Sequence, residues 1–326
     1  MIVTVTTVVV LAIGLLALVL ALYGGFVSSA IIEGLAGDQA SRGISEQKYY
    51  LLGLIGTVVL IARILNVPIF FWMLQSLVPY CPGAMCAYGV VNASAPYSIV
   101  AVGLKLFVPF AYGLWLIVEI SNRGEAEIPL MRGLARSFML LLLPLVLLDS
   151  ATDVLLVASI KPVSLPCCSS IYDVAPPFSP SAYLGPEVGM AVALLAIVLP
   201  LFLVAIQWIG SQSKSAGALT AVLCLLAATF YFVALHDSYA PTVLGLPGHH
   251  CPYCLFQEFP DTAIFAGLFW LGIASVGWCL ALSIVWTRNG LNPQGIKSIS
   301  GLFRKVSSVA LLFSVVSMIS HLMLVF

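Results

Sequence analysis

The sequence predicts an all-α integral membrane protein, a bundle of about eight transmembrane helices. The first observation is composition: the 326 residues are 61% hydrophobic and only 8% charged, with a mean hydropathy of +1.11. A soluble globular protein carries about 25% charged residues. A chain of this size with so few charges cannot cover its surface with polar groups, so it must face lipid over most of its area.

The second observation is the length of the apolar segments. A transmembrane helix needs about 20 mostly apolar residues, and backbone groups in lipid must be satisfied within the segment. The short alternating segments of a barrel are absent. We therefore expect a single transmembrane domain, 1–326, with spans at roughly 3–30, 50–79, 97–120, 137–160, 187–210, 217–243, 262–287 and 306–326.

The third observation is the distribution of positive charge between the loops. The loops after the second, fourth and sixth spans carry only Lys161. Cytoplasmic loops are enriched in Lys and Arg, so both termini are expected outside the cytoplasm, in a plasma membrane. The other connections carry ten positive residues: Arg42, Lys48, Arg123, Arg132, Arg136, Lys214, Arg288, Lys297, Arg304 and Lys305.

This orientation predicts a cysteine-rich extracytoplasmic cap, because six of the eight cysteines fall in the three outer loops. The loops are evenly spaced: Cys81 to Cys167 is 86 residues and Cys167 to Cys251 is 84. Such spacing is typical of a repeat of two-helix units, although any regular bundle can also produce it. The six outer cysteines are Cys81, Cys86, Cys167, Cys168, Cys251 and Cys254.

Ionisable residues also occur within the spans, where each costs about 3 kcal/mol even at the lower estimates. Arg63 and Lys105 are expected to pair with Asp149 and Asp153, which are four residues apart and share a helix face. The pairing would either fix the register of the helices or line a polar cavity open to the outside. Two histidines, His236 and His321, lie in the outer parts of their spans.

The first hypothesis for the outer cysteines is structural. The outside of a cell is oxidising, so the six cysteines are disulfide candidates. Six cysteines allow fifteen connectivities, and the sequence does not choose among them. Cys167 and Cys168 are adjacent and more naturally join two different loops.

The second hypothesis is thiol–disulfide exchange. "HHCPYC" contains a Cys-x-x-Cys pair, Cys251 and Cys254, preceded by His249 and His250, which would tune the thiols. Cys81 and Cys86 would form a relay pair, and a quinone in the bilayer would be the electron carrier. In its arrangement alone, this is similar to the bacterial disulfide-forming membrane oxidoreductases and the vitamin K epoxide reductases, whose bundles have about half as many spans.

The third hypothesis is a metal or haem site. Thiolate and imidazole are common metal ligands, and His249, His250, Cys251 and Cys254 offer four in six residues. A c-type haem needs a histidine directly after the second cysteine, where this chain has Leu255. A b-type haem would use His236 and His321 as axial ligands.

Composition and missing motifs narrow the function classes. Net charge is zero, so there is no basic surface for nucleic acid. The chain has no glycine-rich phosphate loop and no HExxH or G-x-S-x-G motif. We expect a membrane electron-relay protein that exchanges electrons between an extracytoplasmic thiol protein and quinone. The alternatives are a transporter or non-catalytic subunit of a membrane complex, braced by disulfides, and a metal- or haem-binding membrane protein.

Overall fold

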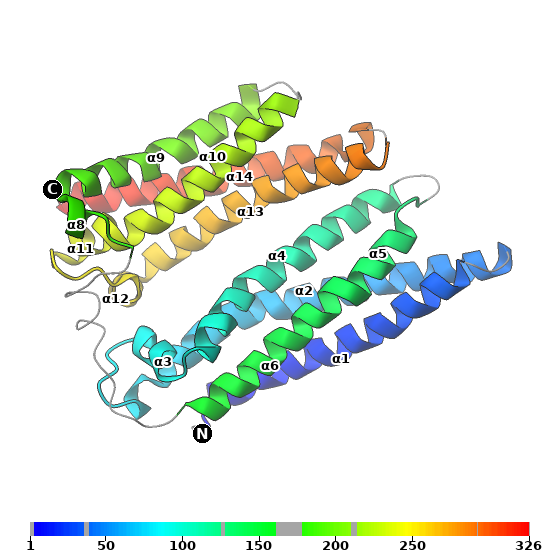
Figure 1. Ribbon diagram of the computed structural model, residues 1–326, viewed down its shortest axis with the longest axis horizontal. Helices are drawn as coiled ribbons and strands as arrows, with labels where there is room; N and C mark the ends of the chain where they lie inside the picture. The colour runs from blue at the N-terminus through cyan, green and yellow to red at the C-terminus, as the bar shows by residue number, and fades with distance from the viewer. Residues whose placement is uncertain are drawn as a thin grey trace. The chain divides into compact units, whose positions relative to one another are not determined.

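The computed structural model describes residues 3–35, 39–124, 128–160, 178–209, 214–291 and 293–325. The fold in these residues is helical, with no strand. The chain divides into two compact units, an N-terminal unit, Met1–Leu165, and a C-terminal unit, Pro166–Phe326. Each unit is a bundle with its own helix packing, shown in blue to green and in green to red in Figure 1.

The N-terminal unit is an up-and-down bundle of four spans. They are α1 (Val5–Gly34), α2 (Gln39–Ser76), α4 (Tyr97–Arg123) and a fourth span made of α5 (Met131–Ser137), η2 (Phe138–Leu142) and α6 (Leu143–Ser159). Each span packs against the next, and α6 returns to α1 to close the ring. The short η1 (Val78–Tyr80) and α3 (Ala87–Ala93) connect α2 to α4 at the end where α1 begins (Figure 1).

The C-terminal unit repeats this architecture with different end structures. Its spans are α9 (Pro186–Ile209), α10 (Lys214–Ala234) with η3 (Leu235–Tyr239) and α11 (Ala240–Leu244), α13 (Pro260–Arg288) and α14 (Lys297–Val325). The ring again follows chain order, and α14 packs against α9. Short helices α8 (Ser181–Leu184), α12 (Pro252–Glu258) and η4 (Pro293–Ile296) lie in the connections.

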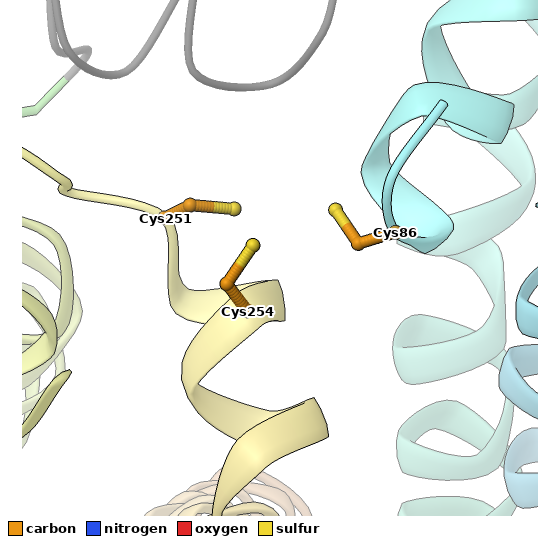
Figure 2. A group of neighbouring side chains, drawn as sticks. All are labelled: Cys86, Cys251 and Cys254. Carbon is orange, nitrogen blue, oxygen red and sulfur yellow. The ribbon is translucent and has the colours of Figure 1, made fainter. Parts of the chain in front are cut away.

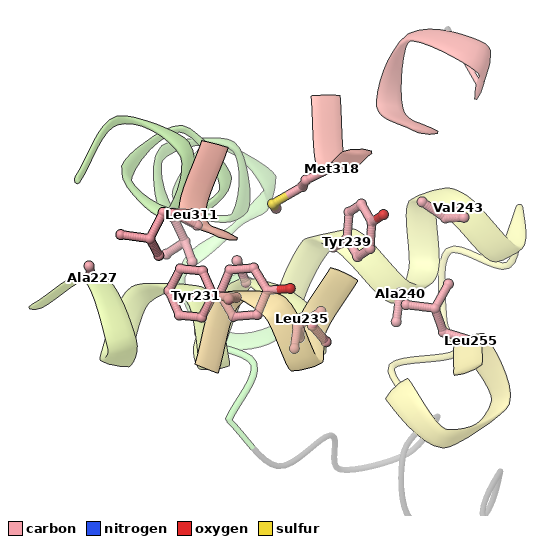
Figure 3. Packing of buried hydrophobic residues seen from close by; sticks show 14 of the residues in the cluster. Ala227, Tyr231, Leu235, Tyr239, Ala240, Val243, Leu255, Leu311 and Met318 are labelled. Atoms are coloured by element: carbon pink, nitrogen blue, oxygen red, sulfur yellow. The ribbon is translucent and has the colours of Figure 1, made fainter. Parts of the chain in front are cut away.

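Aromatic and aliphatic side chains fill the core of the C-terminal unit (Figure 3). Tyr231 of α10 stacks on Phe269 of α13, with ring centroids 3.6 Å apart. Leu311 and Met318 of α14 are buried in the same cluster. In lipid, packing of this kind holds helices together, because lipid tails are as apolar as the side chains.

Among the described residues, eight helices are long and apolar enough to cross a membrane. Large apolar side chains, such as Leu15, Phe26 and Leu225, are exposed along them, as expected for an integral membrane protein facing a lipid bilayer. The orientation, the plasma membrane and the two-helix repeat stay predictions. The helices also extend beyond the predicted spans: one candidate span covers Gly43–Tyr80 and the last begins at Lys297, because backbone hydrogen bonding continues past the apolar run.

Within the described residues, each unit has one π-helical turn, and a proline follows each turn. The N–H of Leu143 bonds the carbonyl of Phe138, and the N–H of Ala240 bonds that of Leu235. Pro144 and Pro241 come directly after Leu143 and Ala240, the residues whose N–H groups close these turns. Proline has no N–H and its ring would clash with the carbonyl four residues earlier, so the wider turn accommodates it. Such turns are frequent at functional sites.

Candidate functional sites

The Cys-x-x-Cys pair lies at the start of α12 in the C-terminal unit. Cys251 is the N-cap of this helix and Pro252 its first residue, so Cys254 follows within the first turn. The two sulfurs lie within 4.8 Å of each other. Cys251 is buried and Cys254 is partly exposed. Figure 2 shows both side chains projecting from the beginning of α12; Cys86, also drawn, belongs to the N-terminal unit.

The two histidines before the pair differ in their surroundings. His250 is buried, and its Nδ1 lies 2.9 Å from the carbonyl oxygen of His236 and 3.2 Å from Ser179 Oγ. A carbonyl only accepts hydrogen bonds, so Nδ1 of His250 carries the proton and Nε2 is left to accept one. His249 is partly exposed, and its backbone N–H donates to Leu246. The predicted metal site on His249, His250, Cys251 and Cys254 stays a prediction.

The predicted relay pair lies in the N-terminal unit. Cys81 follows η1 and Cys86 is the N-cap of α3, and both are buried. Burial raises the pKa of the Cys81 thiol, which lowers its thiolate fraction and therefore its reactivity. No disulfide forms among the described cysteines, so the predicted bridges are not observed there. Cys167 and Cys168 lie outside the described residues.

The intramembrane charges of the N-terminal unit form a network of ion pairs. Arg63 Nη1 lies 2.6 Å from Asp149 Oδ2, and Lys105 Nζ lies 2.7 Å from Asp149 Oδ1 and 2.6 Å from Asp153 Oδ2. All four side chains are about 1% exposed, so the network is out of reach of water. The pairing predicted from the sequence is present, with three helices, α2, α4 and α6, each contributing charge.

Neutral groups extend the network, although Arg63 Nε and Asp153 Oδ1 have no hydrogen-bond partner among the described residues. Arg63 Nη2 donates to Ser150 Oγ at 2.6 Å and to the Val146 carbonyl at 3.3 Å. Ser150 Oγ donates in turn to the Gly14 carbonyl of α1 at 3.3 Å, so all four spans contribute an atom. Lys105 Nζ also lies 5.0 Å from the ring centroid of Phe70, a favourable cation–π distance.

Asn66 was not singled out in the sequence. It lies between Arg63 and Phe70 on the same face of α2, at the i, i+3, i+7 spacing that aligns side chains. It is fully buried, and neither its amide nitrogen nor its amide oxygen has a hydrogen-bond partner among the described residues. The sequence does contain a signal for this residue, because a polar side chain three residues after Arg63 in an apolar run indicates a place in the same polar network.

A series of hydrogen-bonded polar side chains connects three helices of the C-terminal unit. His321 of α14 has its Nε2 2.8 Å from Asp261 Oδ2 and its Nδ1 2.7 Å from the hydroxyl of Tyr239. Asp261 is half exposed and Tyr239 is buried. The series therefore leads from the surface to the interior, which suits the movement of a proton.

The b-type haem on His236 and His321 stays a prediction, and the two histidines differ in how they could serve as axial ligands. Both ring nitrogens of His321 already have partners. His236 directs its Nδ1 to the Phe232 carbonyl at 2.9 Å and packs against the rings of Phe178 and Phe232. An axial ligand needs a ring nitrogen directed at the iron, which His321 could supply only by breaking a hydrogen bond.

The comparisons with known proteins bring no relative to bear on these sites. No protein-family model, curated protein or solved structure matches this chain.

Proposed function

We propose that the protein is an integral membrane thiol–disulfide oxidoreductase that passes electrons between an extracytoplasmic thiol protein and a carrier in the bilayer, such as a quinone. The observation that carries the proposal is the separation of the Cys251 and Cys254 sulfurs, within 4.8 Å at the first turn of α12. A disulfide bond would require the two sulfurs to approach from this separation to roughly 2.05 Å.

The difference in exposure between the two thiols assigns their roles in the exchange reaction. Cys254 is partly exposed and Cys251 is buried, so Cys254 is the thiol that meets a substrate protein. Attack of the Cys254 thiolate on a substrate disulfide forms a mixed disulfide and expels one substrate thiolate. Cys251 then attacks the Cys254 sulfur, releasing the second substrate thiolate and leaving a Cys251–Cys254 disulfide.

Reducing one substrate disulfide consumes two electrons. In that direction the carrier must therefore donate two electrons. A quinol supplies two electrons and two protons, becomes a quinone and restores the dithiol. In the opposite direction, the dithiol reduces a quinone and the disulfide passes to the substrate thiols. Nε2 of His250 accepts the thiol proton in this scheme, because Nδ1 is held by the His236 carbonyl. His249 and the Cys81–Cys86 relay pair keep their predicted roles within the proposal.

The experiment compares two single variants, Cys251→Ser and Cys254→Ser, expressed in cells and quenched with acid before alkylation. Cys251→Ser should accumulate a mixed disulfide with a substrate protein, because the resolving thiol is missing. Cys254→Ser should accumulate several-fold less. Cys279→Ser is the matched control, since Cys279 lies within a span, and should form no adduct.

Two results would contradict the proposal. One is the absence of an adduct with either variant while both fold as well as the parent protein. The other is stoichiometric metal in the purified protein, lost on Cys251→Ser, which would favour the metal-site alternative. Alkylation of the native protein followed by mass spectrometry checks the relative reactivity of the thiols. The buried Cys81 thiol, whose pKa is raised, should react more slowly at pH 8 than the partly exposed Cys254 thiol.

A second candidate function is a transporter or a non-catalytic subunit of a membrane complex. The Arg63–Asp149–Lys105–Asp153 network favours it, since intramembrane charges commonly mark ion or substrate paths. Lys105→Met combined with Asp153→Asn removes one charge of each sign. Loss of solute flux in vesicles without loss of folded protein would support transport over the redox proposal.

A further inference from the structure

A cavity of about 660 Å³ lies within the C-terminal unit, at the end of the bundle where α9 begins. This volume falls in the range of about 300–1,000 Å³ that small-molecule sites occupy. Its wall is mainly apolar and includes Met190, Leu194, Ile197 and Leu322. The polar part of the wall comes from the π-helical turn η3 and the residues next to it, and from His250.

The carboxylate of Asp237 is the central polar group of this wall. Asp237 is 2% exposed, and its Oδ1 accepts a hydrogen bond of 2.8 Å from the backbone N–H of Ser181. Its Oδ2 has no hydrogen-bond partner among the described residues. A buried carboxylate is costly unless its oxygens are compensated, so Oδ2 is an acceptor in need of a donor.

Backbone packing brings Asp237 close to α9. A Cβ atom at Gly189 would lie 3.1 Å from Asp237 Oδ2 and 3.1 Å from the Ser181 side chain. Glycine at this position therefore leaves room beside the carboxylate oxygen. The site is built by three segments, α8, α9 and η3, which pack against each other.

The hydrogen-bonding state of the other polar groups can be worked out from their partners. His321 Nε2 lies against the Asp261 carboxylate, which accepts, so Nδ1 of a neutral His321 accepts from Tyr239. The Tyr239 hydroxyl then donates away from the cavity, and its oxygen keeps a lone pair. His250 likewise keeps Nε2 as an acceptor. Asp237, Tyr239 and His250 thus all present acceptors, and one of them is a carboxylate. The hydroxyl of Ser238, which also lines the cavity and has no described partner, can accept or donate.

We propose that this cavity binds an amphipathic cation, a primary ammonium group on an apolar body. The ammonium supplies three N–H donors and one positive charge, and these match acceptors that include one buried carboxylate. The apolar body contacts the walls formed by α9 and α14. The sulfurs of Cys251 and Cys254, where electron exchange is proposed, are not part of the cavity wall, and His250 is the one residue that the two proposals share.

The test measures binding by isothermal titration calorimetry with the whole protein in lipid nanodiscs. Three probes share one alkyl chain: octylammonium, 1-octanol and octanoate. Empty nanodiscs give the background from partition into lipid. Octylammonium should bind saturably at one site per chain, at least tenfold more tightly than 1-octanol, and octanoate should show no saturable binding.

Two variants locate the site. Asp237→Asn should weaken octylammonium binding at least tenfold, and Glu258→Gln, which removes an exposed carboxylate of α12, should leave it within twofold. Ala193→Phe keeps the carboxylate but fills part of the cavity, and it should also weaken binding at least tenfold. This second variant tests the site even where Asp237→Asn does not fold.

Three outcomes would overturn the proposal. Equal affinity for octylammonium and 1-octanol would show that a neutral donor suffices. Unchanged octylammonium binding in the folded variants Asp237→Asn or Ala193→Phe would show that the cation binds elsewhere. Signals no larger than those of empty nanodiscs would show partition into lipid only.

Discussion

The two four-span units place ionisable side chains on the same set of spans but balance them differently. In the N-terminal unit, the second, third and fourth spans contribute Arg63, Lys105, Asp149 and Asp153, which pair within 2.7 Å and are about 1% exposed. In the C-terminal unit, the same spans contribute Tyr239, Asp261 and His321, and Asp261 is half exposed.

The difference lies in what each arrangement leaves unsatisfied. Two cations and two carboxylates cancel in charge in the N-terminal unit, although Arg63 Nε and Asp153 Oδ1 have no hydrogen-bond partner among the described residues. In the C-terminal unit, Asp237 keeps an oxygen without a described partner next to a cavity. A charge-balanced network of this kind is suited to fixing the register of a bundle, whereas a carboxylate with no cation beside it is suited to binding one.

The largest expected effect comes from breaking the ion-pair network of the N-terminal unit. Asp149→Asn removes the carboxylate that bonds both Arg63 and Lys105, and leaves a buried excess of positive charge. Removing one partner of a buried pair typically costs about 3–5 kcal/mol of folding free energy. Asp237→Asn should cost less, about 1–2 kcal/mol, because it weakens one hydrogen bond to a backbone N–H.

Denaturation of both variants by SDS in mixed micelles gives the two free energies. Glu187→Gln, an exposed acid at the start of α9, is the control and should change stability by no more than about 0.5 kcal/mol. Equal costs for Asp149→Asn and Asp237→Asn would remove the contrast between the units.

A smaller effect is expected from close packing in the N-terminal unit. A Cβ atom at Gly24 would lie 2.6 Å from Phe138 Cε1, and the Phe138 ring has little room to move because it packs edge-to-face against Tyr112 and Trp115. Gly24→Ala should therefore destabilise the protein by about 1–3 kcal/mol. Thermal unfolding in detergent measures the change.

The control is Gly103→Ala on α4, where nothing lies within 4 Å of the added Cβ. It should be neutral or stabilise the protein by up to about 1 kcal/mol, through helix propensity. Gly189→Ala in the C-terminal unit meets the Asp237 carboxylate at 3.1 Å, beside a cavity, and should fall between the two. A neutral Gly24→Ala would show that α1 and η2 can separate without loss.

The smallest effect concerns the hydrogen bond between Tyr239 and His321 in the C-terminal unit. A double-mutant cycle with Tyr239→Phe and His321→Gln should give a coupling energy of about 1 kcal/mol, the usual net value of one hydrogen bond. The control cycle pairs Tyr231→Phe with His321→Gln and should be additive. A coupling near zero in the first cycle would mean that the Tyr239–His321 bond contributes nothing measurable.

Much of the fold could be predicted, because the bilayer imposes its own length and polarity on each span. Residue pairing was also predictable where charges are rare: two cations and two carboxylates in one part of the chain have few other partners. Glu119, which is buried, and Arg123, which is partly exposed, form an i,i+4 ion pair, and this spacing is a signal that the sequence contains.

The division into two units and the cavity could not be predicted in the same way. Both depend on contacts between distant segments, such as the hydrogen bond from the Ser181 N–H to Asp237. The hydropathy of a sequence does not indicate such contacts. Tyr239 and Asp261 lie near span ends, where a tyrosine or an aspartate is ordinary in any membrane protein. Their connection through His321 appears only once α13 and α14 are packed.

The π-helical turn at Leu235–Tyr239 has a consequence for the angular phase of its span. Successive residues of a regular α-helix are rotated by about 100°, so Asp237, Ser238 and Tyr239 would spread over about 200° of its circumference. A π-helical turn contains one more residue than an α-helical turn, so each residue in it is rotated by a smaller angle about the helix axis. All three side chains line the same cavity, which makes one stretch of a lipid-spanning helix a continuous polar wall. Removal of a single residue from this turn would shift the phase of everything after it and point Tyr239 away from His321.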